Sequence, residues 1–222
     1  MRSLAGYTRN PSEHLRHELL DVLSRAPETL IVVNHPLWDQ THVGAEHHRA
    51  ALGELLASSN GSIHALEVNG LRSWKENRAV LEAACALDRP VVSGGDRHGC
   101  EPTAIVNLTR AADFSEFAAE VRGGASEVAV LERYREPLRY RILKSVFDIM
   151  REYPELPGRV RWSDRVFCQI YSGAIQPMSQ IWNGHTPQVV RYFERGVKLS
   201  GNREIQNLLR LSLADGKGPE RL

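Results

Sequence analysis

Three short apolar runs alternate with longer amphipathic stretches in the first half of the chain. The runs at 30–33, 63–68 and 90–93 have the length and the branched apolar residues of buried strands. Between them, residues 48–58 and 74–87 carry apolar side chains at helical spacing. Strands that alternate with helices indicate βα units and a largely parallel sheet. The predicted fold class is therefore α/β.

The pattern changes near residue 133. Two more strands are predicted at 104–108 and 127–131, with a helix at 114–121 between them. After Tyr134 we expect no strand, and the apolar spacing predicts amphipathic helices at 138–150, 189–197 and 204–213. The sequence thus predicts an α/β domain of residues 1–133 and an α-helical C-terminal extension of residues 134–222.

The two halves of the chain carry opposite net charges. Residues 1–132 contain 12 Lys/Arg and 18 Asp/Glu, a net charge of −6, whereas residues 133–222 contain 16 and 9, a net charge of +7. The basic half leaves a nucleic acid or another anionic partner open, but we favour packing of this half on the acidic half. Three cysteines without a CxxC pair fit a reducing compartment. With no signal peptide and no membrane-spanning stretch recognised, we expect a cytoplasmic protein without a membrane partner.

Polar side chains follow three of the predicted strands at the point where each strand ends. His35 follows the first strand, Glu67 and Asn69 end the second, and Asp96 and His98 follow the third. Because the carboxyl ends of parallel strands share one edge of a sheet, we expect these side chains to converge. Residues two apart on extended backbone project the same way, so a carboxylate and an imidazole at 96 and 98 are placed to bind one cation.

These motifs resemble the PHP family (polymerase and histidinol phosphatase domains). The matching elements are Asn-His-Pro after a buried strand, a strand ending in Glu-Val-Asn, and Gly-Gly-Asp-x-His, and they cover about residues 12–132. The resemblance implies a distorted, TIM-barrel-like (β/α)7 barrel that binds zinc, manganese or iron ions and hydrolyses phosphoesters. It places metal ligands at His35, Asp96 and His98, with Asp96 and His98 also catalytic. It places Glu67 and Asn69 beside the ligands or in the substrate pocket.

The chain departs from the family at its opening motif. The family begins with His-x-His on the first strand, whereas no His-x-His occurs here, and His35 matches the second half of the family's barrel. We therefore expect a partial barrel, a fragment that lacks an N-terminal half and part of the metal site. Three ligands and an open position would still suffice for a single zinc ion. The hypotheses are a truncated metal-dependent phosphoesterase, a non-catalytic remnant that binds a partner through its basic helical tail, and a catalytic part completed by a second chain or copy.

Two cationic residues follow the strand that carries Glu67. Arg72 and Lys75 are candidates for binding an anionic small molecule such as a phosphoester. Glu67 has an equal alternative as a buried salt bridge without a site role, and Trp38 either walls the pocket or packs in the core. His64 opens a strand at the opposite end from the site, which favours a structural role.

Overall fold

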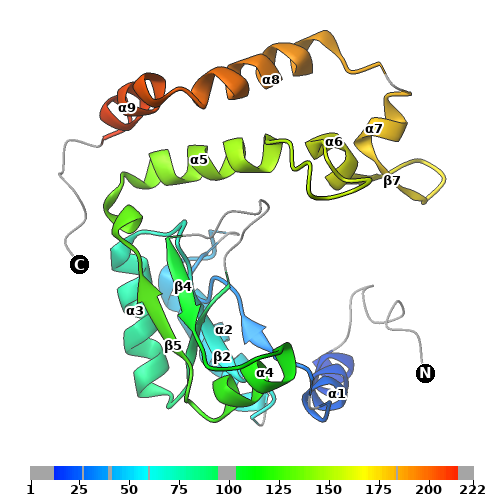
Figure 1. Cartoon of the computed structure of the whole chain (residues 1–222). Coiled ribbons are helices and arrows are strands. Elements are labelled where there is room, and N and C mark those ends of the chain that lie inside the picture. Colours follow the sequence, from blue (N-terminus) through cyan, green and yellow to red (C-terminus); the bar gives the residue numbers. More distant parts are fainter. Residues whose placement is uncertain are drawn as a thin grey trace. The chain divides into compact units, whose positions relative to one another are not determined.

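The computed structural model describes residues 13–26, 28–39, 42–59, 61–94, 104–183 and 185–214. These residues form two compact units, one of residues 13–94 with 104–133 and one of residues 134–214. Helices and strands are mixed in the first unit, and helices dominate the second (Figure 1). The predicted α/β class is confirmed, and no barrel is closed by the strands of the described ranges.

A parallel sheet of three strands lies at the centre of the first unit. Its order is β1-β2-β3, and the register pairs Val32 with Ala65 and Glu67 with Val92. The strands are short: β1 is Val32–Val33, β2 is Ala65–Val68 and β3 is Val91–Ser93. The helices that precede β3 are α1 (Glu13–Ser24), α2 (Ala45–Ser58) and α3 (Trp74–Ala86).

Alternation along β2 decides what each face of the sheet contacts. Ala65 packs with Val92 and with Val121 of α4 (Phe114–Arg122) in the buried core. Leu66 and Val68 project to the opposite face and are also buried, and α3 packs against β2. Glu67 shares the face of Ala65 but lies one step nearer the carboxyl end, where the apolar core gives way to polar side chains.

The last two strands of this unit pair with each other. β4 (Ile105–Leu108) and β5 (Glu127–Val130) form an antiparallel pair, whereas the sheet of β1, β2 and β3 is parallel. Glu120, near the end of α4, accepts hydrogen bonds from the Thr109 hydroxyl and the Arg110 N–H. These bonds hold the end of α4 at the point where β4 finishes. The chain therefore enters β5 from that end and must run back along β4.

Asn107 of β4 connects this pair to the end of the parallel sheet. Its side-chain amide accepts a hydrogen bond from the Ser93 N–H at 2.7 Å and donates one to the Ser93 carbonyl at 2.8 Å. The Ser93 hydroxyl also donates to the carbonyl of Ile105 at 2.7 Å. The side chains thus satisfy backbone groups that a regular ladder would otherwise pair, and they fix the chain at Gly94, which follows.

The second unit is mainly helical but contains a hairpin. After a 3₁₀ helix at Glu132–Arg135, its helices are α5 (Leu138–Met150), α6 (Trp162–Arg165), α7 (Met178–Ile181), α8 (Gln188–Ser200) and α9 (Arg203–Ser212). Strands β6 (Phe167–Gln169) and β7 (Ile175–Pro177) pair antiparallel, so the expectation of no strand after Tyr134 was wrong. Gly173, at φ 83°, allows the tight reversal between them. α5 packs against α8, and α8 against α9 (Figure 1).

One arginine joins the segment between α5 and α6 to the end of α5. The Arg165 guanidinium donates hydrogen bonds to the carbonyls of Arg159 and Val160 at 2.9 and 2.7 Å. It also donates to the carbonyls of Ile149 and Arg151 at 2.7 and 2.6 Å. A single planar cation therefore fixes a stretch that has no helix or strand of its own.

Among the described residues, no helix combines the length and the apolar character needed to cross a membrane.

Candidate functional site

The carboxyl ends of β1 and β2 bring His35 and Glu67 into direct contact. Oε2 of Glu67 lies 2.8 Å from Nδ1 of His35 and accepts a hydrogen bond of 2.9 Å from the backbone N–H of the same residue. The Glu67 side chain is only 1% exposed and that of His35 is 16% exposed. A buried carboxylate thus holds a histidine that remains partly open to solvent.

Asn69 extends this pair along β2. Its Oδ1 accepts a hydrogen bond of 2.7 Å from the Leu71 N–H, which fixes the orientation of the amide. Its Nδ2 is then directed at Oε1 of Glu67, 3.4 Å away, and lies 3.2 Å from Nδ1 of His35. The structure therefore brings together three of the residues predicted to lie at strand ends.

These contacts determine which nitrogen of His35 carries a proton. Nδ1 cannot both accept a hydrogen bond from the Asn69 amide and donate one to the carboxylate of Glu67. The contact with the carboxylate is shorter and charge-assisted, so we assign Nδ1–H as the donor to Glu67 and treat the Asn69 approach as a contact. In the neutral imidazole, Nε2 then carries the lone pair, as in a histidine that acts as a base or a metal ligand.

The backbone at His35 is in a conformation that non-glycine residues rarely adopt. Its φ is 48°, in the left-handed region. Such a conformation costs on the order of 1–3 kcal/mol and persists only where the surroundings enforce it. Here the hydrogen bond from the His35 N–H to Glu67 enforces it. The same carboxylate therefore fixes both the backbone and the ring.

Asn77 of α3 was not predicted from the sequence, but it supports the site from behind. Its Oδ1 accepts a hydrogen bond from the Asn69 N–H at 2.9 Å, and its Nδ2 donates to the Asn69 carbonyl at 2.8 Å. Asn77 is 2% exposed and lies one turn before Val80 on the inner side of the helix. A polar residue on the apolar side of a predicted helix is the signal that identifies such a residue in a sequence.

Gly94 is a second residue that sequence reasoning did not connect to Glu67. A Cβ at this position would lie 2.3 Å from Oε1 of Glu67 and 2.9 Å from its Cδ. Real Cβ atoms do not approach other atoms so closely. The absence of a side chain at 94 therefore provides the space that the carboxylate occupies.

The predicted ligands Asp96 and His98 lie outside the described residues. Within the part of the chain that the structure describes, no three His, Cys, Asp or Glu side chains form a group that could hold a metal ion. His35 nevertheless has the surroundings of a metal-ligating histidine, because its Nδ1 faces a buried carboxylate and its Nε2 is the nitrogen left to coordinate. This part of the donor set fits a divalent metal with nitrogen and oxygen ligands.

The two cations predicted to bind substrate lie in different surroundings. The Arg72 guanidinium stacks on the indole of Trp38, 4.0 Å from the ring centroid, and its Nε is 3.8 Å from Oε1 of Glu76. Trp38 in turn contacts the His35 ring, with the two centroids 5.5 Å apart. Arg72 is therefore joined to the site through Trp38, whereas the Lys75 side chain is exposed on α3 and has no such link.

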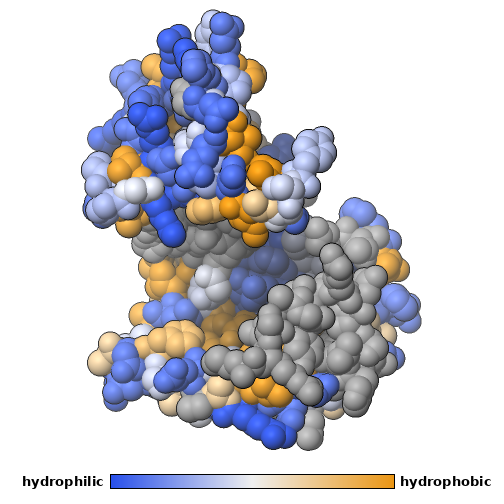
Figure 2. All heavy atoms as spheres, turned by 90° about the vertical axis from the view of Figure 1, so that its right-hand side faces the viewer, coloured by the Kyte–Doolittle hydropathy of each residue, from blue (hydrophilic) through white to orange (hydrophobic). Residues whose placement is uncertain are grey.

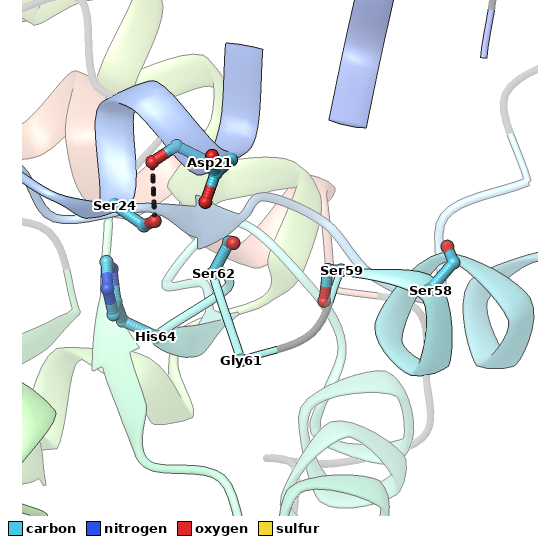
Figure 3. Close-up of a pocket in the computed structure, with 7 residues that line it drawn as sticks. All are labelled: Asp21, Ser24, Ser58, Ser59, Gly61, Ser62 and His64. Atoms are coloured by element: carbon cyan, nitrogen blue, oxygen red, sulfur yellow. Dashed lines mark hydrogen bonds between the residues drawn. The ribbon is translucent and has the colours of Figure 1, made fainter. Parts of the chain in front are cut away.

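A separate polar cavity of about 420 Å³ lies at the amino ends of the parallel strands (Figure 3). Its lining side chains are hydroxyls, a carboxylate and an imidazole, from Asp21, Ser24, Ser58, Ser59, Ser62 and His64. Nδ1 of His64 accepts a hydrogen bond of 2.9 Å from the Ile31 N–H, which ties β2 to the start of β1. Burial lowers the pKa of His64, and the positive charges of Arg122 and Arg89 lower it further. This bond agrees with the structural role predicted for His64.

No protein-family model, no curated protein and no solved structure matches the chain. The interpretation of the site therefore depends on the contacts of its own residues.

Proposed function

We propose that this chain is a PHP-like, metal-dependent phosphoester hydrolase whose described residues form one side of the active site. The observation that supports it is the buried Glu67 carboxylate that orients His35 through Nδ1. Histidines that bind metals are usually oriented in this way by a carboxylate or a carbonyl. In the proposal, the α/β unit corresponds to part of a (β/α)7 barrel.

His35, Asp96 and His98 would hold the metal, with Asp96 and His98 also at the reacting centre. A bound divalent ion would supply hydroxide at neutral pH and neutralise negative charge on phosphorus. Glu67 keeps the His35 ring in one orientation, and Asn69 donates toward the same carboxylate. Arg72 and Lys75 are the proposed cations for an anionic substrate, and the contacts of Arg72 favour it over Lys75.

Metal content and hydrolysis of an aryl phosphate test this proposal together. The purified chain should contain a stoichiometric divalent metal, and Asp96→Asn should remove both the metal and the activity. His47→Gln provides a matched control, because His47 is exposed on α2 outside the strand-end cluster. A chain without stoichiometric metal and without activity that depends on Asp96 would refute the proposal.

Glu67→Gln tests the orienting role separately. Glutamine keeps the size of the side chain but removes the charge that faces Nδ1 of His35. Metal affinity, measured by competition with a chromogenic chelator, should fall by about 10- to 100-fold, as is usual when the group behind a metal-binding histidine is altered. Unchanged metal affinity would leave Glu67 with the alternative role of a buried salt bridge.

A second candidate function is a binding module formed by the C-terminal helices. α8 and α9 expose large apolar side chains, with Val189 and Leu211 each 74% exposed; the others are Tyr192, Phe193, Leu199 and Leu208. Residues 133–222 also carry the net charge of +7. On the face of the molecule that Figure 2 draws, hydrophobic residues (orange) lie beside hydrophilic residues (blue) at the surface. These exposed apolar side chains of α8 and α9, called the strip below, lie in a basic part of the chain. They favour a partner segment with an apolar side and acidic flanks.

A labelled amphipathic peptide of Leu and Glu, with its Leu and Lys counterpart as the control, tests this second function. The acidic peptide should bind with an affinity that decreases at high salt, and the double variant Phe193→Ser/Leu211→Ser should abolish binding. Equal binding of both peptides, or binding that survives the double variant, would refute it. Light scattering of the chain alone tests whether the strip instead pairs with a second copy.

A further inference from the structure

The exposed side chain of Trp38 lies against the ring of His35. Its backbone N–H donates a hydrogen bond of 2.9 Å to the His35 carbonyl, which closes the turn His35-Pro36-Leu37-Trp38. The indole is 41% exposed and meets the imidazole at an interplanar angle of 79° with the centroids 5.5 Å apart. An aromatic side chain of this exposure walls the site and does not belong to the buried core.

The turn that carries Trp38 is fixed from both sides. Nε2–H of His48 donates to the carbonyl of Pro36 at 3.0 Å. After the turn, the Asp39 carboxylate accepts hydrogen bonds from the N–H groups of Val43 and Gly44 at 3.0 and 2.7 Å. The position of the indole relative to His35 is therefore set before any ligand binds, which reduces the entropy lost on binding.

The guanidinium of Arg72 adds a positive charge to this arrangement. It lies 4.0 Å from the centroid of the indole, at the distance of a cation–π contact. A stacked guanidinium keeps its N–H groups in its own plane, and the carboxylate of Glu76, 3.8 Å from Nε of Arg72, already shows an anion approaching there. An imidazole, an exposed indole and a guanidinium thus follow one another at the edge of the sheet.

We propose that Trp38 is a stacking platform that selects phosphoesters carrying a planar aromatic group. This inference rests on the proposed phosphoesterase function and specifies its substrate class. The guanidinium of Arg72 covers one face of the indole, so the aromatic group of the ligand lies on the other face and its phosphate lies toward His35 at the edge of the ring. Aryl phosphates and nucleoside monophosphates share this chemistry, and the experiment below distinguishes them.

Binding is measured with phosphonates, which a phosphoesterase does not hydrolyse, by titration calorimetry on the full chain. Phenylphosphonate, the 5′-methylenephosphonate analogue of adenosine monophosphate, and methylphosphonate are compared for the wild type, Trp38→Leu and Trp38→Phe. Trp182→Phe is the matched control, because that tryptophan pairs with Trp162 in the second unit. Circular dichroism establishes that each variant is folded.

The two aromatic ligands should bind the wild type more tightly than methylphosphonate. Trp38→Leu should weaken the tighter aromatic ligand by about 5- to 150-fold, the loss expected for one stacked ring, and should change methylphosphonate less than about twofold. Trp38→Phe should retain most of the preference, and Trp182→Phe all of it. The aromatic ligand that depends more strongly on Trp38 identifies an aryl phosphate or a nucleotide as the substrate.

Three outcomes would overturn the inference. They are no binding of any ligand, equal affinity of the wild type for methylphosphonate and both aromatic ligands, and an equal loss for all ligands in Trp38→Leu. An equal loss for all ligands is the result expected if the indole only supports the turn and does not contact the ligand. Because hydrolysis is not measured, Trp38-dependent binding without turnover would retain the platform and refute the hydrolase function alone.

Discussion

Gly94→Ala is expected to damage the site from the neighbouring strand. Gly94 follows β3, and a Cβ there would lie 2.3 Å from Oε1 of Glu67 and 3.1 Å from its Cγ. No rotation of the alanine can relieve this contact, because Cβ is fixed by the backbone. The Glu67 carboxylate must therefore leave the place where it holds His35.

The magnitude follows from the bonds that Glu67 would lose. Its carboxylate accepts from both the backbone N–H and Nδ1 of His35, at 2.9 and 2.8 Å. A buried hydrogen bond to a charged group contributes about 1.5–3 kcal/mol, and crowding in a packed interior costs about 1–3 kcal/mol. The two bonds together contribute about 3–6 kcal/mol. Because the displaced carboxylate can retain one of them and its displacement relieves the crowding, we expect the free energy of unfolding to fall by about 2–4 kcal/mol.

Urea unfolding of the full chain, followed by circular dichroism, measures this loss. Gly53→Ala is the matched control, because Gly53 lies inside α2 and a Cβ there meets nothing within 4 Å. That substitution should stabilise the chain by about 0.5–1 kcal/mol through helix propensity. In a Glu67→Ala background the clash is absent, so adding Gly94→Ala should cost less than about 1 kcal/mol. A Gly94→Ala variant within about 0.5 kcal/mol of the wild type, or a cost unchanged in that background, would refute the reasoning.

Three further predictions concern side chains that stabilise one of the two units from within. Asn77→Ala should lower the free energy of unfolding by about 1–3 kcal/mol in the same urea assay, because the Asn69 N–H loses its acceptor while the Asn69 carbonyl keeps the hydrogen bond from the Arg72 N–H; a loss below about 0.5 kcal/mol would contradict this. Arg165→Lys should lower the free energy of unfolding by about 2–4 kcal/mol, since an ammonium cannot reach all four carbonyls. Arg159→Lys, at an exposed side chain, is the control and should lower it by less than about 0.5 kcal/mol. Equal effects of the two substitutions would exclude this role of Arg165. In the folded chain the pKa of His64 is lowered from 6.5, so the unfolded chain takes up a proton at His64 at a higher pH than the folded chain does. The stability contributed by neutral His64 is therefore complete above the unfolded pKa, and it is lost as the pH falls through the folded pKa. Unfolding midpoints measured from about pH 7.5 to about pH 5 should therefore fall less steeply in His64→Asn than in the wild type, and parallel curves would exclude this contribution.

The elements that the sequence predicted well are those with a long, uniform pattern. The amphipathic spacing of 138–150 predicts a helix with the bounds that α5 has. The hairpin of β6 and β7 was missed because its strands mix polar with apolar residues and lack the continuous apolar run of β1 and β3, which are not longer. Its remaining signal is Gly173, where a reversal requires positive φ. The antiparallel pairing of β4 with β5 depends on where α4 ends in space, which residue spacing does not specify.

The same distinction applies to the site. The expectation that polar residues at strand ends converge required only the direction of the strands, and the structure brings His35, Glu67 and Asn69 together. Asn77 and Gly94 contribute by filling or vacating space beside these residues. Which side chains meet in space depends on register and helix placement. Periodicity alone does not specify either, so the supporting residues required the structure.

The alternative roles of Glu67, a buried salt bridge or a part of the site, are not exclusive. A salt bridge that served stability alone would be satisfied by a histidine with ordinary backbone geometry, and replacing such a pair by apolar residues often costs nothing. Here the carboxylate also enforces a left-handed φ at His35, which costs on the order of 1–3 kcal/mol. The hydrogen bonds that Glu67 accepts from the backbone and the ring of His35 offset that cost, and together they fix the ring and the attached turn with Trp38. The strained backbone is therefore an argument that the strand-end cluster is retained for binding or catalysis, and the Glu67→Gln experiment decides which part of that role depends on its charge.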